Sequence, residues 1–234
     1  MFRLMFSIAA LLVTSSCAHQ PKPVAYKPDI KSIAIIPATD PTAYTLENVS
    51  AVQFVIPLAA TVNYMDSKEK AKQFNAKMLA RQVSLGPIFT EAVAGSLRSY
   101  GYQVQILEGI SRPPDDIDDV DYEKVSTTAD AVLHLRFKEV GLFSPRGSVN
   151  YLPRVNANGT LFVIGRQDSL YDEDIYYGVD ARKGNAWAID SDEKFAYRTF
   201  EAVMANLDEI SNAFEVGTRE VSRRVSERVR ESIK

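Results

Sequence analysis

The segment ADAVLHLRFKEVGLF, residues 129–143, most constrains the fold, because apolar and polar residues alternate along it from Val132 onwards. Side chains of a β-strand point alternately to its two faces, so this pattern predicts one long strand. His134 is expected on one face of that strand, and Leu133 and Leu135 on the opposite face. An apolar strand face must be buried against another layer, so the body is expected to be a sheet with covering elements.

Five further segments carry strand signals. Short apolar or alternating runs bounded by proline, glycine or polar residues are typical of strands. They lie at residues 31–37, 102–107, 160–167, 174–182 and 186–190. A polar turn near Asp168 joins the third and fourth segments, and a turn at 183–185 precedes the last. The later part of the chain is therefore expected to form a run of antiparallel strands.

Two helices are expected to cover this sheet. In residues 85–101, Pro87 suits a first helical turn and Gly101 suits the position after the last turn. Residues 199–233 are also predicted to be helical, with apolar residues at every fourth position: Val221, Val225, Val229 and Ile233. The predicted fold class is therefore α+β, a mixed sheet with helices packed on it and a long carboxyl-terminal helix.

The first sixteen residues are typical of a secretory signal. Arg3 precedes an uncharged run at 4–13 and then three small residues, at 14–16. The run is too short for a membrane-spanning helix, which needs about 20 apolar residues. Cys17, the only cysteine, follows directly. This pattern resembles the lipobox of bacterial lipoproteins, in which the chain is cut before the cysteine and the cysteine is acylated.

The alternative is an ordinary secreted protein with a free thiol, which is a liability in an oxidising compartment. With lipidation at Cys17, acyl chains would hold the protein on a membrane without a spanning helix. Residues 17–29 would then be a proline-rich tether that places the body roughly 30 to 40 Å from the bilayer. In lipoproteins of enteric-type bacteria an aspartate after the cysteine is typical of inner-membrane retention, and here Ala18 follows Cys17. The resemblance therefore implies the outer membrane, with the body on its periplasmic face.

The length of the chain indicates how many domains it forms, and its net charge limits the class of partner. The chain has 234 residues, of which 30–234 suit a single domain. A hydrophobic content of 46% supports a packed core. The formal net charge of −3 argues against a dedicated nucleic-acid binder.

Four pieces of the body resemble a group of bacterial envelope proteins. They are KSIAIIP at 31–37, SYGYQVQIL at 99–107, TTADAVLHLRF at 127–137 and VDARKGNAW at 179–187. They look like the periplasmic domain of the curli-secretion lipoprotein, and the amino-terminal domain of the Tol-system propeller protein is similar in fold. Members of this group act mostly as assembly, secretion or regulatory partners. The resemblance therefore implies a non-enzymatic binding or assembly module that acts through an envelope protein or through self-association.

One acidic loop has the composition of a cation site. Its carboxylates are Asp115, Asp116, Asp118, Asp119, Asp121 and Glu123. Hard cations prefer oxygen ligands, but the glycine and glutamate positions of the EF-hand loop are not matched here. We interpret the segment as a solvated loop and predict neither a metal site nor a cofactor.

No catalytic group is predicted either. His134 is interpreted as structural, and the only other histidine, His19, lies in the tether. Ser67 and Lys70 have the spacing of a serine–lysine nucleophile, but the partner motifs of that class are absent from the sequence. The alternative function is a cell-envelope hydrolase with a carboxylate-based site. Two buried carboxylates facing each other in an apolar cleft would favour it.

Two stretches are candidates for contacts with other molecules. VSAVQFVIPLAATV, residues 49–62, has no charge and contains Pro57, which argues against the interior of a helix or central strand. This stretch is either core or an interface, and the candidate interface residues are Val52, Phe54, Val55, Ile56 and Leu58. The carboxyl-terminal helix is rich in arginine, which indicates either a solvated face or contact with an acidic partner or lipid head groups.

Overall fold

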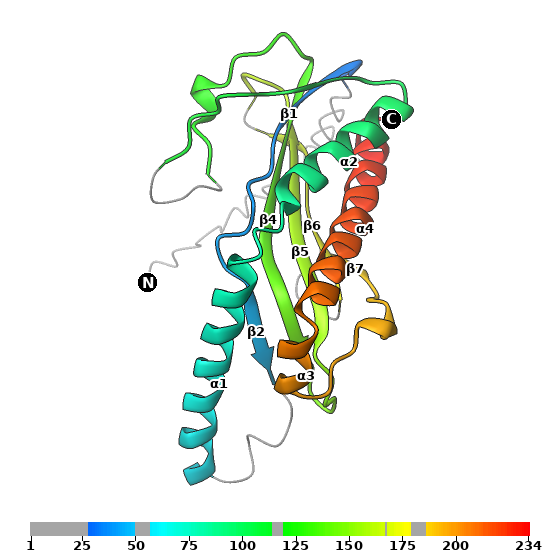
Figure 1. Cartoon of the computed structure of the whole chain (residues 1–234). Coiled ribbons are helices and arrows are strands. Elements are labelled where there is room, and N and C mark those ends of the chain that lie inside the picture. Colours follow the sequence, from blue (N-terminus) through cyan, green and yellow to red (C-terminus); the bar gives the residue numbers. More distant parts are fainter. Residues whose placement is uncertain (1–27, 50–56, 114–118, 167, 179–185) are drawn as a thin grey trace, which may run out of the picture.

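A computed structural model gives the fold, and it describes residues 28–49, 57–113, 119–166, 168–178 and 186–234. One seven-stranded sheet carries helices against one face (Figure 1). The strands are β1 Ser32–Ile36, β2 Thr45–Asn48, β3 Gln103–Ile106, β4 Ala131–Ser144, β5 Leu152–Phe162, β6 Ser169–Tyr177 and β7 Trp187–Ile189. The helices are α1 Pro57–Leu79, α2 Leu85–Ser99, α3 Phe200–Ala205 and α4 Leu207–Ile233, with short 3₁₀ turns η2 Tyr122–Lys124 and η3 Glu193–Phe195. The predicted α+β class is confirmed.

The sheet is mixed, and β4 is its central strand. The strand order is β3-β1-β4-β5-β6-β7. The β1 strand is parallel to both β3 and β4, whereas β4, β5 and β6 are antiparallel to one another. The β2 strand pairs with the end of β4, at Gly141–Ser144, beyond the part that β1 covers. The long alternating segment therefore supplies pairing surface for three other strands.

Gly141 allows β2 to lie against β4. A Cβ built at this position would sit 2.1 Å from the backbone oxygen of Thr45 on β2. Real Cβ contacts are never this short, so a larger residue would displace the short strand. A contact with α1 also fixes the start of β2. The Asn75 side chain of α1 accepts a 2.8 Å hydrogen bond from the backbone N–H of Tyr44, the residue directly before β2.

The alternation along β4 separates two apolar clusters. Leu133 and Leu135 belong to the main core, which α2 and α4 cover. Val132 belongs to a smaller cluster on the opposite face, together with Ile36 and Val125. A β-bulge between Phe137 and Glu139 shifts the register with β5, after which Val140 and Leu142 face the main core.

The stripe on α4 faces the sheet as the periodicity predicts. Val221, Val225 and Val229 are fully buried, whereas Ile233 at the helix end is only partly buried. Gly217 lets the helix approach the sheet closely, because a Cβ there would sit 2.6 Å from the Tyr177 ring. In Figure 1, α2 and α4 lie side by side over the sheet.

Four elements differ from the sequence prediction, and one of them is β6, which begins at Ser169, five residues before the predicted 174. The segment predicted as one helix at 199–233 is two helices, because Asn206 leaves helical geometry and its side chain donates to the Ala202 carbonyl, closing α3. The β7 strand is parallel to β6, so it does not return as an antiparallel hairpin strand. The β5 strand begins at Leu152, eight residues before the predicted 160. Its first half was not predicted because it contains small and polar residues such as Asn156, Asn158 and Gly159, which give little strand signal.

The long segment 38–84 contains two elements that the sequence analysis did not predict, β2 and α1. Pro57 is the first residue of α1, a position that proline tolerates because its missing N–H needs no partner there. Leu58 therefore lies in a helix, not in an extended interface segment. Near the end of α1, Phe74 and Met78 are fully buried in the main core. No helix in the described part of the chain is long and apolar enough to cross a membrane.

Candidate functional site

Most of the predicted site residues lie outside the described part of the chain. These are Cys17, Val52, Phe54, Val55 and Ile56, and in α1 the side chain of Leu58 is not described either. Of the acidic loop, the described carboxylates are Asp119, Asp121 and Glu123. Asp121 pairs with Lys124 at 2.7 Å. Among the described residues, no group of three or more histidine, cysteine or acidic side chains is placed to hold a metal ion.

An open groove of about 480 Å³ lies between η2 and the turn that joins β5 to β6. Its apolar lining comes from Tyr122 and Val125 on one side and from Phe162 and Ile164 on the other. The Tyr122 and Phe162 rings meet edge to face, with centroids 4.9 Å apart. Tyr122 is 40% exposed and Ile164 is 45% exposed. Large apolar side chains that remain this exposed beside a concave surface are typical of binding sites.

Tyr122 also contacts the histidine of β4. Its hydroxyl forms a 2.7 Å hydrogen bond with Nδ1 of His134. Burial, together with the nearby charges of Arg136 and Arg112, lowers the pKa of His134 to about 4, so the ring is neutral at pH 7. Within the described part of the chain, Nε2 of His134 is buried and has no hydrogen-bond partner.

A polar network continues from the groove across β4, β5 and β6. Its centre is Asn158, whose Oδ1 accepts 3.0 Å hydrogen bonds from Nε of Arg136 and from the Thr160 hydroxyl. The Asn158 amide nitrogen donates to Asp172 and Asp174 at 3.0 and 2.9 Å. Thr160 also lines the groove, so the network reaches its edge.

The two aspartates of this network do not match the predicted hydrolase site. Asp172 is exposed and Asp174 is partly buried, and both accept hydrogen bonds from one amide. A carboxylate that acts as a general acid near neutral pH needs apolar surroundings that raise its pKa. The surroundings of this pair are polar, so they do not provide that environment.

In the serine–lysine spacing of α1, the lysine takes part in an ion pair. Lys70 forms a 2.6 Å ion pair with Asp66, one helical turn earlier. This contact raises the pKa of Lys70, whereas a lysine that acts as a base needs a lowered pKa.

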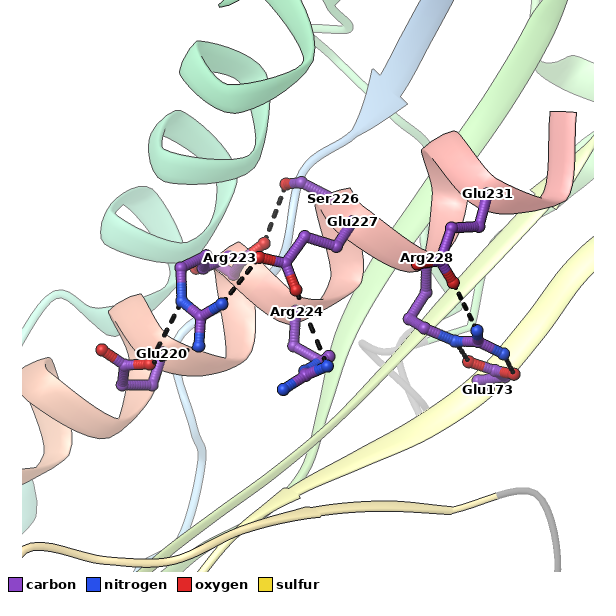
Figure 2. Close-up of polar contacts among 9 residues, drawn as sticks. Glu173, Glu220, Arg223, Arg224, Ser226, Glu227, Arg228 and Glu231 are labelled. Carbon is purple, nitrogen blue, oxygen red and sulfur yellow. Dashed lines mark hydrogen bonds and ion pairs between the residues drawn. The ribbon is translucent and has the colours of Figure 1, made fainter. Parts of the chain in front are cut away.

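Arginines of α4 are paired within the domain (Figure 2). Arg223 binds Glu220 and Glu227, and Arg228 binds Glu173 of β6 through two hydrogen bonds of 2.6 and 2.8 Å. Arg224 and Arg228 both stack on Trp187, at 4.7 and 4.9 Å from its ring centroid. These contacts explain much of the helix's arginine content and favour the solvated-face interpretation over a basic binding surface.

The groove was not predicted from the sequence, and the signals for it were weak. Tyr122 and Phe162 are 40 positions apart, and neither belongs to a recognisable motif. Arg136 could be placed on the polar face of a strand, but its partner Asn158 lies in the half of β5 that carries little strand signal. The groove depends on tertiary pairing, which local patterns do not encode.

No family model matches the sequence, and no curated protein matches it either. Among solved structures, a hypothetical protein from Chlamydia trachomatis aligns with 12% identity over 87% of this chain and 98% of that chain, with a TM-score of 0.39. A lipoprotein from Neisseria meningitidis aligns with 18% identity over 78% of this chain and 97% of that chain, with a TM-score of 0.31. These are distant similarities that assign no family, and the resemblance to the curli-secretion and Tol-propeller group stays a prediction.

Proposed function

We propose that this chain is a lipid-anchored protein of the bacterial cell envelope that acts by binding a protein, either a partner or a second copy of itself. The observation that carries the proposal is the position of Cys17, the only cysteine, directly after an apolar run that ends in three small residues. Acylation accounts for a cysteine at this position, whereas a free thiol in a secreted chain has no explanation.

The body supports a binding role more than a catalytic one. The groove beside η2 exposes Tyr122 and Ile164 at the surface. Of the polar groups close to it, His134 is neutral and Arg136 and Asp172 are held in a network by Asn158, while the charged side chains of Glu123 and Arg166 line the groove. A binding surface needs exposed apolar area with a few fixed polar groups, and this region provides both.

Anchoring is tested by labelling the full chain with a palmitate analogue in a Gram-negative host. The wild-type protein should incorporate label and fractionate with the outer membrane. Cys17→Ser should lose the label and remain uncleaved or soluble, while Ser16→Ala, a small-for-small change beside it, should keep both properties. A wild-type protein without label, or a Cys17→Ser variant that fractionates identically, contradicts the anchoring.

Binding is tested separately with a photo-crosslinking amino acid. We expect a probe at position 164, at the groove, to give a discrete protein adduct in living cells. The same probe at position 72, an exposed lysine of α1, is the control and should not give this adduct. Identical patterns from both positions would show that the groove is not the binding surface. An adduct at twice the mass of the chain would identify a second copy as the partner.

A further inference from the structure

The outer edge of β3 is a second surface that can bind a protein, and none of its residues lines the groove. In the described part of the chain, β3 pairs with β1 alone, so this strand ends the sheet on that side. The N–H groups of Gln103 and Leu107 donate to carbonyls of β1. Backbone groups of successive residues point to opposite edges of a strand, so those of Val104 and Ile106 point away from the sheet.

This edge has none of the features that usually prevent an edge strand from pairing with another chain. Natural edge strands are protected by charged side chains, by proline or by a bulge. The sequence of β3 is QVQI, which contains neither a charge nor a proline. It pairs with β1 in an unbroken register, and Gln103 and Gln105 are exposed. The strand is therefore open to the addition of a further strand.

The residue in the middle of the edge favours a second copy of the same strand. The hydrogen bonds to β1 run from Gln103 to Leu107, so two such strands that overlap fully and antiparallel place Gln105 opposite Gln105 of the second copy. Val104 then pairs with Ile106 of the second copy, and each such pair exchanges both of its backbone hydrogen bonds. Like charges at opposed positions would destabilise this pairing, whereas a glutamine amide can both donate to and accept from its own copy.

Arg98 and Glu108 give the edge a charge of each sign. Arg98, exposed on α2, donates to the outward carbonyl of Val104 at 3.4 Å, which places its guanidinium at the edge. This distance is long for a hydrogen bond from a charged group, so a pairing strand can replace the contact at little cost. Glu108 is exposed and follows β3 directly before Gly109, whose positive φ of 64° turns the chain.

The antiparallel pairing brings Glu108 of the second copy to Arg98. Ile106 packs on the main core and Leu107 on the small cluster of the opposite face, so the next residue in the alternation, Glu108, points to the helix face of the sheet. The register places it opposite Tyr102, on the face that α2 and Arg98 cover. A two-fold axis makes the same contact a second time, because Arg98 of the second copy then meets Glu108 of the first.

The other charged groups near this edge do not oppose the pairing. Lys31, before β1, forms an ion pair with Asp29 at 2.8 Å, and Asp130 accepts hydrogen bonds from the start of β1. Arg230 of α4 stacks on Tyr100 at 4.6 Å and adds positive charge to the helix face. A hollow of about 310 Å³ lies beside β3 and β1, and among the described residues that line it none is charged.

We propose that two copies of this chain pair antiparallel through β3, with Gln105 at the two-fold axis, so that one sheet continues across both copies. This pairing names a second copy as the partner in the proposed binding function, and it rests on that function. The strand is short, so the dimer is weak in solution. Anchoring of both copies to one membrane strengthens it by raising their effective concentration.

The test is disulfide trapping in the full chain, expressed in a Gram-negative host and oxidised in the envelope. Gln105→Cys places two thiols at an opposed pair whose Cα atoms are about 4.5 Å apart, which is within the range of a disulfide. Gln103→Cys is the matched control on the same strand and face, because the register separates its two copies by about 14 Å. Gln105→Cys should give a reductant-sensitive band at twice the mass of the chain, and Gln103→Cys and the wild type should not.

Charge reversal in the Gln105→Cys background tests the second contact. Arg98→Glu and Glu108→Arg should each lower the rate of disulfide formation about fivefold, because like charges then meet at both contacts. The double variant should restore the rate to within about twofold. Arg219→Glu makes the same charge reversal at an exposed position of α4 and should leave the rate unchanged.

Several outcomes would overturn the proposal. Equal yields at positions 103 and 105 would indicate random collision, and no band at either position would show that the edge does not pair. A double variant that stays as slow as the single ones would exclude the contact between Arg98 and Glu108. The same comparison with the purified full chain in detergent requires neither acylation nor the groove. A failure of this pairing is therefore distinguishable from a failure of anchoring at Cys17 or of binding at position 164.

Discussion

Gly217 of α4 lies so close to the Tyr177 ring of β6 that a Cβ at position 217 would sit 2.6 Å from it. Val155 of β5 closes the same contact, at 2.9 Å. The long helix therefore meets the sheet through a position where a side chain has no room. This contact fixes the distance between the two layers, and with it the packing of the valine stripe that follows along α4.

Gly217→Ala should consequently destabilise the fold. Alanine favours a helix over glycine by about 1 kcal/mol, but overpacking a core contact costs about 1–3 kcal/mol, and the steric cost should prevail. Denaturant unfolding would measure the difference. Gly95→Ala in α2 is the matched control, because a Cβ there meets nothing within 4 Å and should stabilise by up to about 1 kcal/mol. A stabilised Gly217→Ala variant would contradict this account of the layer contact.

Val225→Asp should unfold the domain or lower its melting midpoint strongly. Val225 is fully buried and its side chain lies next to Gly159 of β5, so an aspartate would place an unpaired charge against the sheet. The cost of such a charge is several kcal/mol. Asn212→Asp adds the same charge at an exposed position of α4 and should leave the midpoint nearly unchanged. Similar melting of both variants would show that the stripe does not pack as described.

The ion pair between Arg228 and Glu173 should couple α4 to β6 measurably. It is bidentate, its side chains are 27% and 16% exposed, and the Glu173 contact raises the pKa of Arg228. A double-mutant cycle with Arg228→Gln and Glu173→Gln should give a coupling free energy of about 1–2 kcal/mol. The pair of Arg223 and Glu227 within α4 is more exposed and should give less than about 0.5 kcal/mol. Equal couplings would contradict the importance of burial here.

Whether an element of the fold can be predicted from the sequence depends on whether its pattern is local. The alternation along 129–143 and the valine stripe of the last helix predict β4 and the buried face of α4, because burial imposes those periods directly. The β2 strand has four residues and depends on Gly141 of β4 for its place, so its own segment contains little signal. The parallel pairing of β7 follows from tertiary contacts that its three residues do not encode.

The candidate site illustrates the same limit. His134 could be assigned to a strand face from the alternation, but its contact with Tyr122 depends on a turn that folds back over the sheet. Arg136 could be predicted as polar and outward, yet its hydrogen bond to Asn158 depends on the pairing of β4 with β5. The strand face on which each of these residues lies was predictable, whereas the residues that they contact were not.

His134 should make the fold sensitive to mild acid. Its pKa in the folded protein is about 4, below its ordinary value of 6.5, so the unfolded chain binds more protons between these two values. Stability therefore falls as pH decreases from 6.5 towards 4, and the histidine's contribution to this loss should be about 2 kcal/mol by pH 5.

The groups that face this ring are Arg112, Arg136 and Asp119, in addition to the Tyr122 hydroxyl. His134→Gln should therefore lose less stability than the wild type over this interval, by roughly 4–8 °C in melting midpoint for a domain of this size. His19→Gln, in the predicted tether, should behave as the wild type does. If His134→Gln and the wild type lose stability in parallel from pH 7 to pH 5, the histidine is not held neutral by its burial beneath Tyr122.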